Sequence, residues 1–156
     1  MQRLPTVFVF VVLASQAALA FTPVRKCPSG VDLPESVRIQ DCTSLPCWLQ
    51  NGAKIDAIGE GIVSPVTTST MTTYMTIFFA GLSIDFPPPD GWDDACAKGT
   101  APGTCPVQQG DRFDYHLEHP GVTLPLAGVN AIIEVGIRAD DGSHVTCLQF
   151  DAFIHN

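Results

Sequence analysis

The sequence predicts an all-β fold, an immunoglobulin-like antiparallel β-sandwich of two sheets. Three observations carry this prediction. About seven short segments either alternate apolar with polar residues or are rich in β-branched and aromatic ones. The chain's 13 glycines and 13 prolines punctuate these segments, and six cysteines in 156 residues suit a disulfide-bonded domain. No linker or internal repeat divides the chain, so a single domain is expected.

The first half of the chain holds three predicted strand regions. Residues 31–40 form a first strand that Pro34 interrupts. Residues 52–63 alternate in part, and residues 67–86 are rich in Thr, Ile, Phe and Tyr, which fit a pleated surface. Within this last region Gly81 permits a bulge or a bend. Three of its side chains share one face: Met75, Ile77 and Phe79.

The second half of the chain holds three more predicted strands, at residues 112–118, 130–138 and 145–154. The first of them alternates in its apolar side chains: Phe113, Tyr115 and Leu117. Residues 130–138 show the clearest alternation, with four apolar side chains on one face: Ala131, Ile133, Val135 and Ile137. Such alternation predicts one face against a core and one against water.

Between these halves, residues 86–92 read F-P-P-P-D-G-W. Three prolines favour an extended segment, and Asp-Gly favours a turn. The segment therefore lies in a loop or at a sheet edge. Two interpretations stay open: a stiff lip beside a cavity that presents Phe86 and Trp92, or a rigid connection with Trp92 half-buried.

The N-terminus has the three parts of a secretory signal peptide. Arg3 gives a basic start, residues 6–13 form an apolar run, and residues 18–20 offer an A-x-A cleavage site. The apolar run is too short for a membrane span; the alternative is a buried N-terminal strand. We expect residues 1–20 to be removed and residues 21–156 to form the exported domain.

Charge and composition exclude some partners. The formal net charge is −8 and the isoelectric point is about 4.6, so nucleic-acid phosphates would repel the chain. With 46% hydrophobic and only 15% charged residues, general disorder is excluded. No Asn-x-Ser/Thr sequon occurs, which favours extracellular fluid over the lysosomal lumen, the alternative location.

The even number of cysteines in an exported chain predicts three disulfides, although six cysteines allow fifteen pairings. Spacing favours one pairing, in which near neighbours close short rings and the outermost cysteines tie the chain ends together: Cys42–Cys47, Cys96–Cys105 and Cys27–Cys147. The alternative is a zinc site. It is disfavoured because no C-x-x-C pair exists and an oxidising compartment favours disulfides.

No catalytic motif is found. The sequence lacks a glycine-rich phosphate loop, a G-x-S-x-G elbow and an H-E-x-x-H helix. Asp114, His116, Glu118 and His119 lie close enough for a metal-site hypothesis, but on a strand the first three share one face and His119 points away. We interpret them as a solvated strand face. Three acids are interpreted as a plain acidic turn, with calcium as the alternative: Asp90, Asp93 and Asp94. No catalytic residue, metal or cofactor is expected.

Several segments together carry a family signature. They are P-C-W-L at residues 46–49, the glycine- and proline-containing run at residues 81–91, C-P-V-Q at residues 105–108, I-I-E-V at residues 132–135, and Cys147. The order of the six cysteines and the C-P-V-Q stretch are specific when combined. On these motifs the mature chain resembles the ML lipid-recognition domain family, closest to its branch of Niemann–Pick type C two sterol and lipid carriers.

The resemblance implies two sheets that splay around a lipid cavity, the same three disulfides, and binding of one lipid without catalysis. By position, a pocket aromatic falls on Phe86 and a pocket valine on Val122. A mouth tyrosine becomes Leu126, an inner tryptophan becomes Val135 and a second tryptophan becomes Leu148. This loss of aromatic bulk indicates a cavity of different shape, suited to a straight-chain or small amphipathic ligand.

The expected lipid-contact residues are apolar and aromatic side chains: Phe79, Ile84, Phe86, Tyr115, Val122, Leu126, Ile133, Val135 and Phe150. The alternative is that these residues form a plain core. Phe86 and Val122 are expected near the entrance.

We expect a secreted, monomeric carrier. It would take up a sterol, a fatty acid or a hydrophobic semiochemical and release it to a membrane or receptor. A second class of function is recognition of a microbial lipid or a protein partner in innate immunity, which the few, scattered basic residues disfavour. A hydrolase, the third class, would need a nucleophile and base that the sequence does not display.

Overall fold

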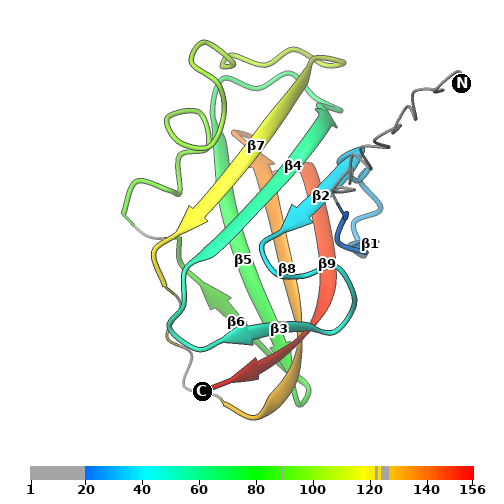
Figure 1. Cartoon of the computed structure of the whole chain (residues 1–156). Helices are drawn as coiled ribbons and strands as arrows, with labels where there is room; N and C mark the ends of the chain where they lie inside the picture. The colour runs from blue at the N-terminus through cyan, green and yellow to red at the C-terminus, as the bar shows by residue number, and fades with distance from the viewer. Residues whose placement is uncertain (1–19, 89, 122, 124–126) are drawn as a thin grey trace, which may run out of the picture.

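The computed structural model describes residues 20–88, 90–121, 123 and 127–156, which form nine β-strands and no helix (Figure 1). The larger sheet, sheet A, has five strands in order: β1 (Arg25–Lys26), β9 (His144–His155), β8 (Val129–Ala139), β5 (Met71–Phe79) and β6 (Leu82–Phe86). A sixth strand, β3 (Cys47–Gln50), pairs with β9 in parallel. In the described part of the chain, no helix is long and apolar enough to span a membrane.

The smaller sheet, sheet B, has three antiparallel strands in order: β2 (Ser36–Ile39), β4 (Ile55–Val63) and β7 (Arg112–His119). Figure 1 shows sheet B crossing in front of sheet A, so that the two sheets form the layers of a sandwich. The predicted fold class is therefore confirmed. The parallel β3–β9 pair is an addition that strand patterning did not indicate.

Most predicted strands recur with changed ends. The region 67–86 is two strands, because Ala80 and Gly81 adopt φ of 49° and 80° and reverse the chain. Two residues with positive φ match a tight hairpin turn, which is sharper than the bulge or bend expected at Gly81. The first predicted strand shortens to β2, which begins two residues after Pro34. Sequence patterning missed β1 and β3, which have only two and four residues.

The disulfides follow the predicted pairing: Cys27–Cys147, Cys42–Cys47 and Cys96–Cys105. All six cysteines are paired, so no thiolate remains for zinc. Cys27–Cys147 spans 120 residues and fastens the chain after β1 to the first half of β9. This disulfide therefore holds the edge strand β1 of sheet A covalently against its neighbour β9.

The proline-containing segment fits the interpretation of a rigid connection. Trp92 is half-buried and packs against buried apolar residues, while the Lys98 ammonium lies 5.6 Å from its ring centroid. Neither Trp92 nor Phe86 lines the large cavity described below. Pro89 lies outside the described residues.

The interior contains two separate clusters of buried apolar side chains. One cluster gathers residues of β2, β5, β8 and β9, including Ile77, Ile133 and Phe150. The other gathers residues of β4, β5, β7 and β8 with nearby loops. Ala57 and Val135 are only partly buried, although each contacts both clusters. The buried core is therefore interrupted at Ala57 and Val135, between the two clusters.

Candidate functional site

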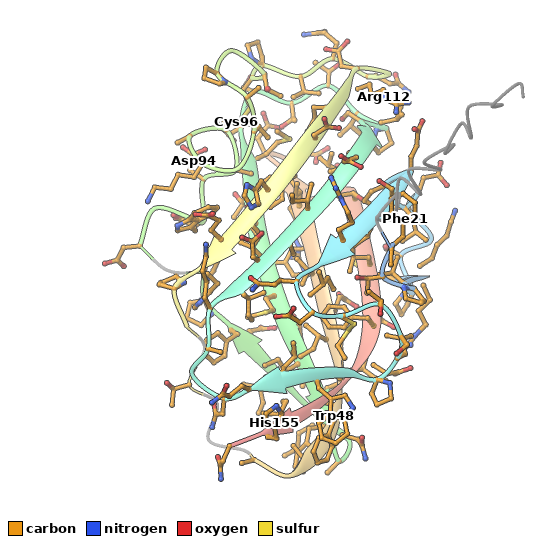
Figure 2. All side chains as sticks on the ribbon, viewed as in Figure 1. Phe21, Trp48, Asp94, Cys96, Arg112 and His155 are labelled. Atoms are coloured by element: carbon orange, nitrogen blue, oxygen red, sulfur yellow. A yellow bond between two sulfur atoms is a disulfide. The ribbon has the colours of Figure 1, made fainter. Side chains whose placement is uncertain are left out.

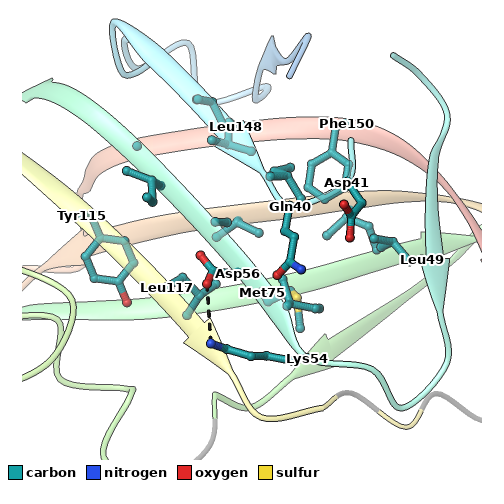
Figure 3. A pocket seen from close by; sticks show the side chains of 18 of the residues that line it. Gln40, Asp41, Leu49, Lys54, Asp56, Met75, Tyr115, Leu117, Leu148 and Phe150 are labelled. Carbon is teal, nitrogen blue, oxygen red and sulfur yellow. Dashed lines mark hydrogen bonds and ion pairs between the residues drawn. The ribbon is translucent and has the colours of Figure 1, made fainter. Parts of the chain in front are cut away.

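A cavity of about 460 Å³ lies between the two sheets (Figure 3). Its lining includes residues of both core clusters and of both sheets. This volume falls within the roughly 300–1,000 Å³ typical of small-molecule sites. Since well-packed interiors hold few voids larger than a water molecule, this space is the candidate binding site of the chain.

Strand alternation directs apolar side chains into the cavity from both sides. Sheet B contributes chiefly inward-facing residues: Val37, Ile39, Ile55, Ala57, Tyr115 and Leu117. Sheet A contributes mainly aliphatic residues and one phenyl ring: Met75, Ile77, Ile133, Val135, Leu148 and Phe150. Apolar walls of this kind favour an apolar ligand, because burial of apolar surface drives its transfer from water.

Small residues on β4 explain why space remains. Ala57 and Gly59 occupy successive inward positions in the middle strand of sheet B, and both line the cavity. The methyl group of Ala57 cannot fill the gap to the facing sheet. The space beside Gly59 is taken by Pro34, whose Cγ lies 3.3 Å from where a Cβ of Gly59 would stand. Larger side chains, Ile55 and Ile62, stand on either side of them along β4.

The cavity interior offers few polar groups. Among its described lining residues, the only hydroxyls belong to Tyr115 and Thr146. The Tyr115 hydroxyl lies 2.7 Å from Thr73 Oγ1, and Thr146 Oγ1 donates to the Asp32 carbonyl over 3.1 Å. Burial raises the pKa of Tyr115. Both hydroxyls therefore have partners within the protein and leave the cavity walls effectively apolar.

Exposed lining residues mark the mouth of the cavity: Gln40, Asp41, Trp48, Gln50 and Lys54. They come from the two residues that follow β2, from β3 and from the residue before β4. The Trp48 side chain is 66% exposed. Its ring centroid lies 4.9 Å from that of Phe153 and 5.9 Å from that of His155, and Figure 2 shows Trp48 beside His155 at the same end of the molecule.

Only some of the predicted contact residues line this cavity. Four of them do: Tyr115, Ile133, Val135 and Phe150. Phe79, Ile84 and Phe86 do not. Ile84 and Phe86 lie on β6, the edge strand of sheet A, one strand beyond the wall formed by β5. Val122 and Leu126 lie outside the described residues.

Sequence reasoning missed most of the β2, β3 and β4 side of the cavity. The missed residues include Val37, Ile39, Leu49, Ile55 and Ala57. The partial alternation of residues 52–63 was a usable signal, because it places Ile55 and Ala57 on one face. Their neighbours across the cavity were not predictable from that pattern alone.

The charged face of β7 has the arrangement expected of a solvated strand. Asp114 accepts a hydrogen bond from the Gly61 amide over 2.7 Å. His116 Nε2 lies 2.8 Å from Asp56 Oδ1. Atoms of Asp56, His116 and Glu118 come within 4.8 Å of one another, but Lys54 Nζ contacts both carboxylates, at 3.5 Å and 3.1 Å. One ammonium group, that of Lys54, is therefore shared between the two carboxylates of this cluster.

His119 faces the opposite way, as the alternation predicts. It is 6% exposed, and its ring centroid lies 6.3 Å from that of Phe86. Its Nδ1 accepts a hydrogen bond from the Gly121 amide over 3.3 Å, whereas its Nε2 has no partner among the described atoms. Burial lowers the pKa of His119. It does not line the cavity.

Comparisons with known proteins find relatives along almost the whole chain. A family model described as the ML domain matches residues 22–154. The NPC intracellular cholesterol transporter 2 of Bos taurus is 22% identical over 149 residues, which cover 96% of this chain and 95% of that protein. Its counterpart in Sus scrofa is 24% identical over 156 residues and covers 100% of both.

Solved structures share the fold. A Niemann-Pick type C2 protein from Japanese carpenter ant has a TM-score of 0.70 at 15% identity, covering 85% of this chain and 98% of that one. Chicken MD-1 complexed with lipid IVa has a TM-score of 0.51 at 15% identity, covering 82% and 85%. At this level of identity, the likeness to both structures concerns the fold alone.

Proposed function

The chain belongs to the ML domain family, and we propose that it is a secreted carrier that binds one lipid between its sheets and releases it to a membrane or receptor. The observation that carries the proposal is the cavity of about 460 Å³ with apolar walls. Each methylene buried there contributes about 0.8 kcal/mol. A long acyl chain or a sterol would therefore bind well without any catalytic residue.

A carrier role fits the side chains better than catalysis does. The described lining contains no serine and no cysteine. Its two hydroxyls, on Tyr115 and Thr146, are engaged with Thr73 and the Asp32 carbonyl. A nucleophilic mechanism needs a base within hydrogen-bond reach of the nucleophile, and neither hydroxyl lies against one. The protein would therefore leave its ligand chemically unchanged.

The ligand contacts in this proposal fall into two groups. Tyr115, Ile133, Val135 and Phe150 contact the ligand directly, since they line the cavity. The others are proposed for a ligand long enough to extend past β5 toward β6 and the neighbouring loop: Phe79, Ile84, Phe86, Val122 and Leu126. Phe86 and Val122 rest on the family resemblance.

Secretion and a monomeric state are part of the proposal. Removal of residues 1–20 as a signal peptide would deliver the chain to an oxidising compartment, where paired cysteines are stable. Three disulfides that use all six cysteines support this location. Extracellular fluid is favoured over the lysosomal lumen because the sequence has no N-glycosylation sequon.

The test uses the full mature chain after removal of co-purified lipid. Fluorescent fatty-acid and sterol analogues are titrated into it, and native mass spectrometry counts the ligands bound. We expect saturable binding of one ligand per chain and displacement by unlabelled lipid. Failure to bind any fatty-acid or sterol analogue would refute the proposal.

A second candidate is recognition of a microbial lipid or a protein partner in innate immunity. The likeness to chicken MD-1, solved with lipid IVa, favours it. Binding of lipopolysaccharide without uptake of neutral lipids would support this candidate over the carrier. The scarcity of basic side chains around the cavity argues for the carrier, because phosphorylated glycolipids need cations.

A further inference from the structure

The mouth of the cavity carries more negative than positive charge. Among the described residues that line the cavity, Lys54 is the only lysine or arginine, whereas Asp41 and Asp56 are both acidic. Asp41 is exposed and makes no ion pair with a described residue. The polar end of a bound lipid would therefore meet an acidic rim.

Lys54 is already committed to two carboxylates. Its Nζ lies 3.1 Å from Glu118 Oε1 and 3.5 Å from Asp56 Oδ2, and Figure 3 shows the contact with Asp56. The hydrogen bond to Glu118 raises the pKa of Lys54, so the ammonium stays charged at neutral pH. The same two carboxylates also face His116, whose Nε2 lies 2.8 Å from Asp56 Oδ1 and 3.8 Å from Glu118 Oε1. Asp41 adds a further carboxylate to the cavity lining.

Among the described residues of this rim, an anionic head group would find no lysine or arginine that is free of a carboxylate partner. To reach Lys54, a carboxylate or phosphate would have to displace Glu118 or Asp56 and leave that group without its ammonium. Like charges at a few ångströms repel even in water, by roughly fivefold in affinity for each unit charge.

Uncharged polar groups find suitable partners at the same place. Gln40 and Gln50 are exposed residues of the mouth, and each side-chain amide offers two donors and an acceptor. A hydroxyl or an ester oxygen can hydrogen-bond to them without a charge. Resting on the proposed lipid-carrier function, we infer that the cavity selects lipids with an uncharged polar end, such as alcohols and esters, over lipids that end in a carboxylate or phosphate.

Two ligands of equal chain length test this inference: tetradecan-1-ol and tetradecanoate. Their dissociation constants are measured on delipidated protein at neutral pH by displacement of a fluorescent lipid. We expect the alcohol to bind at least fivefold more tightly. The preference should shrink in about 1 M salt, where screening acts within roughly 3 Å.

Two charge-neutralising variants test whether the preference for the alcohol arises at the mouth of the cavity. Asp41→Asn removes the unpaired carboxylate, and Glu118→Gln releases Lys54 from one partner. Each should raise the ratio of the affinity for tetradecanoate to the affinity for tetradecan-1-ol about fivefold. Asp90→Asn is the matched control, because it removes the same charge from an exposed loop residue outside the cavity lining and should change neither.

The possible outcomes distinguish a failure of the head-group preference from a failure of the carrier function. Equal or tighter binding of tetradecanoate by the unmodified protein would overturn this inference alone and leave the carrier function standing. A change of equal size in Asp90→Asn would also overturn it, because net charge and not the rim would then set the preference. If no fatty acid, alcohol or sterol binds, the carrier function fails and this inference fails with it.

Discussion

The hydroxyl of Tyr115 on β7 lies 2.7 Å from Oγ1 of Thr73 on β5, so a hydrogen bond joins sheet B to sheet A through the middle of the sandwich. Thr73 is 3% exposed and Tyr115 is 6% exposed. Neither hydroxyl can turn to bulk water without opening the sandwich. The bond holds the two sheets together beside the cavity, since Tyr115 also lines the cavity.

Removing one partner of this bond should destabilise the fold. Tyr115→Phe leaves the Thr73 hydroxyl buried and unpaired, and we expect the free energy of unfolding to fall by about 1–2 kcal/mol in urea titrations. Adding Thr73→Val to the Tyr115→Phe variant removes the unpaired Thr73 hydroxyl and should restore part of the lost free energy of unfolding. A double variant whose loss equals the sum of the two single losses would show that the residues are not coupled.

The two tyrosines of the chain should make stability fall at alkaline pH. Burial raises the pKa of Tyr115, and burial together with the Glu134 carboxylate raises the pKa of Tyr74 to about 12. Tyrosines of the unfolded chain ionise near pH 10. Between about pH 10 and 12 the unfolded state therefore binds fewer protons than the folded state, and the free energy of unfolding decreases as pH rises.

Tyrosinate absorbance checks this directly, because no other tyrosine contributes. The folded protein should show little signal at pH 10, whereas the protein in denaturant should be half ionised there. Tyr74→Phe should weaken the alkaline decline in stability. A folded protein that titrates at the same pH as the denatured one would contradict the expected shift.

Alternation along single strands predicted the inner faces correctly, because every second side chain of a strand points to the same side. Ile133 and Val135 were placed in this way, and both line the cavity. The position of the cavity could not be predicted, because it depends on which facing residues are small, and the side chains that face Ala57 across the cavity come from the other sheet. The contact between Lys54 and Glu118 joins residues 64 positions apart and has no local signal.

The resemblance and the cavity lining differ at Phe86, for a topological reason. The resemblance points to Phe86 as a pocket aromatic, but Phe86 is registered with Met75 on the edge strand β6. Met75 lines the cavity and Phe86 lies one strand further out. Which of two neighbouring strands borders the open space depends on packing between sheets, and a motif on one strand does not carry that information.

Filling the cavity should abolish ligand binding without loss of the fold. In Val135→Trp, an indole would occupy the space where the two core clusters meet. We expect at least a tenfold loss of affinity for a fluorescent fatty acid, with a free energy of unfolding within about 1 kcal/mol of the unmodified chain, because the added atoms enter empty space instead of a packed core. The control is Val63→Trp, at a position that is 48% exposed and outside the cavity lining.

The result for Val135→Trp is informative only beside that control. Full affinity in both variants would mean that the ligand does not enter this cavity. Loss of affinity in both would point to a general effect of added tryptophan. The expected pattern is loss in Val135→Trp alone.

The three disulfides should differ in what they contribute to stability. Cys27–Cys147 closes a loop of 120 residues and Cys42–Cys47 a loop of only five. In the chain-entropy model, the long loop contributes about 5 kcal/mol and the short loop about 2 kcal/mol. Replacing each pair by serines and measuring denaturant unfolding should show the larger loss for Cys27–Cys147. Equal losses would indicate that native-state effects outweigh loop entropy.

Acid should destabilise the fold through His119. Burial lowers the pKa of its imidazole, so protonation is easier in the unfolded chain, where the pKa is near 6.5. Below about pH 6.5 the unfolded state binds more protons, and the free energy of unfolding therefore falls as pH decreases. The pKa of Asp56 is lowered from about 3.8 by its hydrogen bond with His116, so its own contribution is lost only at more acidic pH.

A substitution separates His119 from the other histidines. His119→Leu keeps an apolar side chain beside Phe86 and removes the titrating group, so the free energy of unfolding should depend less on pH between about 6.5 and 5. His155→Gln at the cavity mouth is the control and should keep the original slope. If His119→Leu retains that slope and His155→Gln loses it, the acid sensitivity originates at the rim of the cavity and not in the buried imidazole.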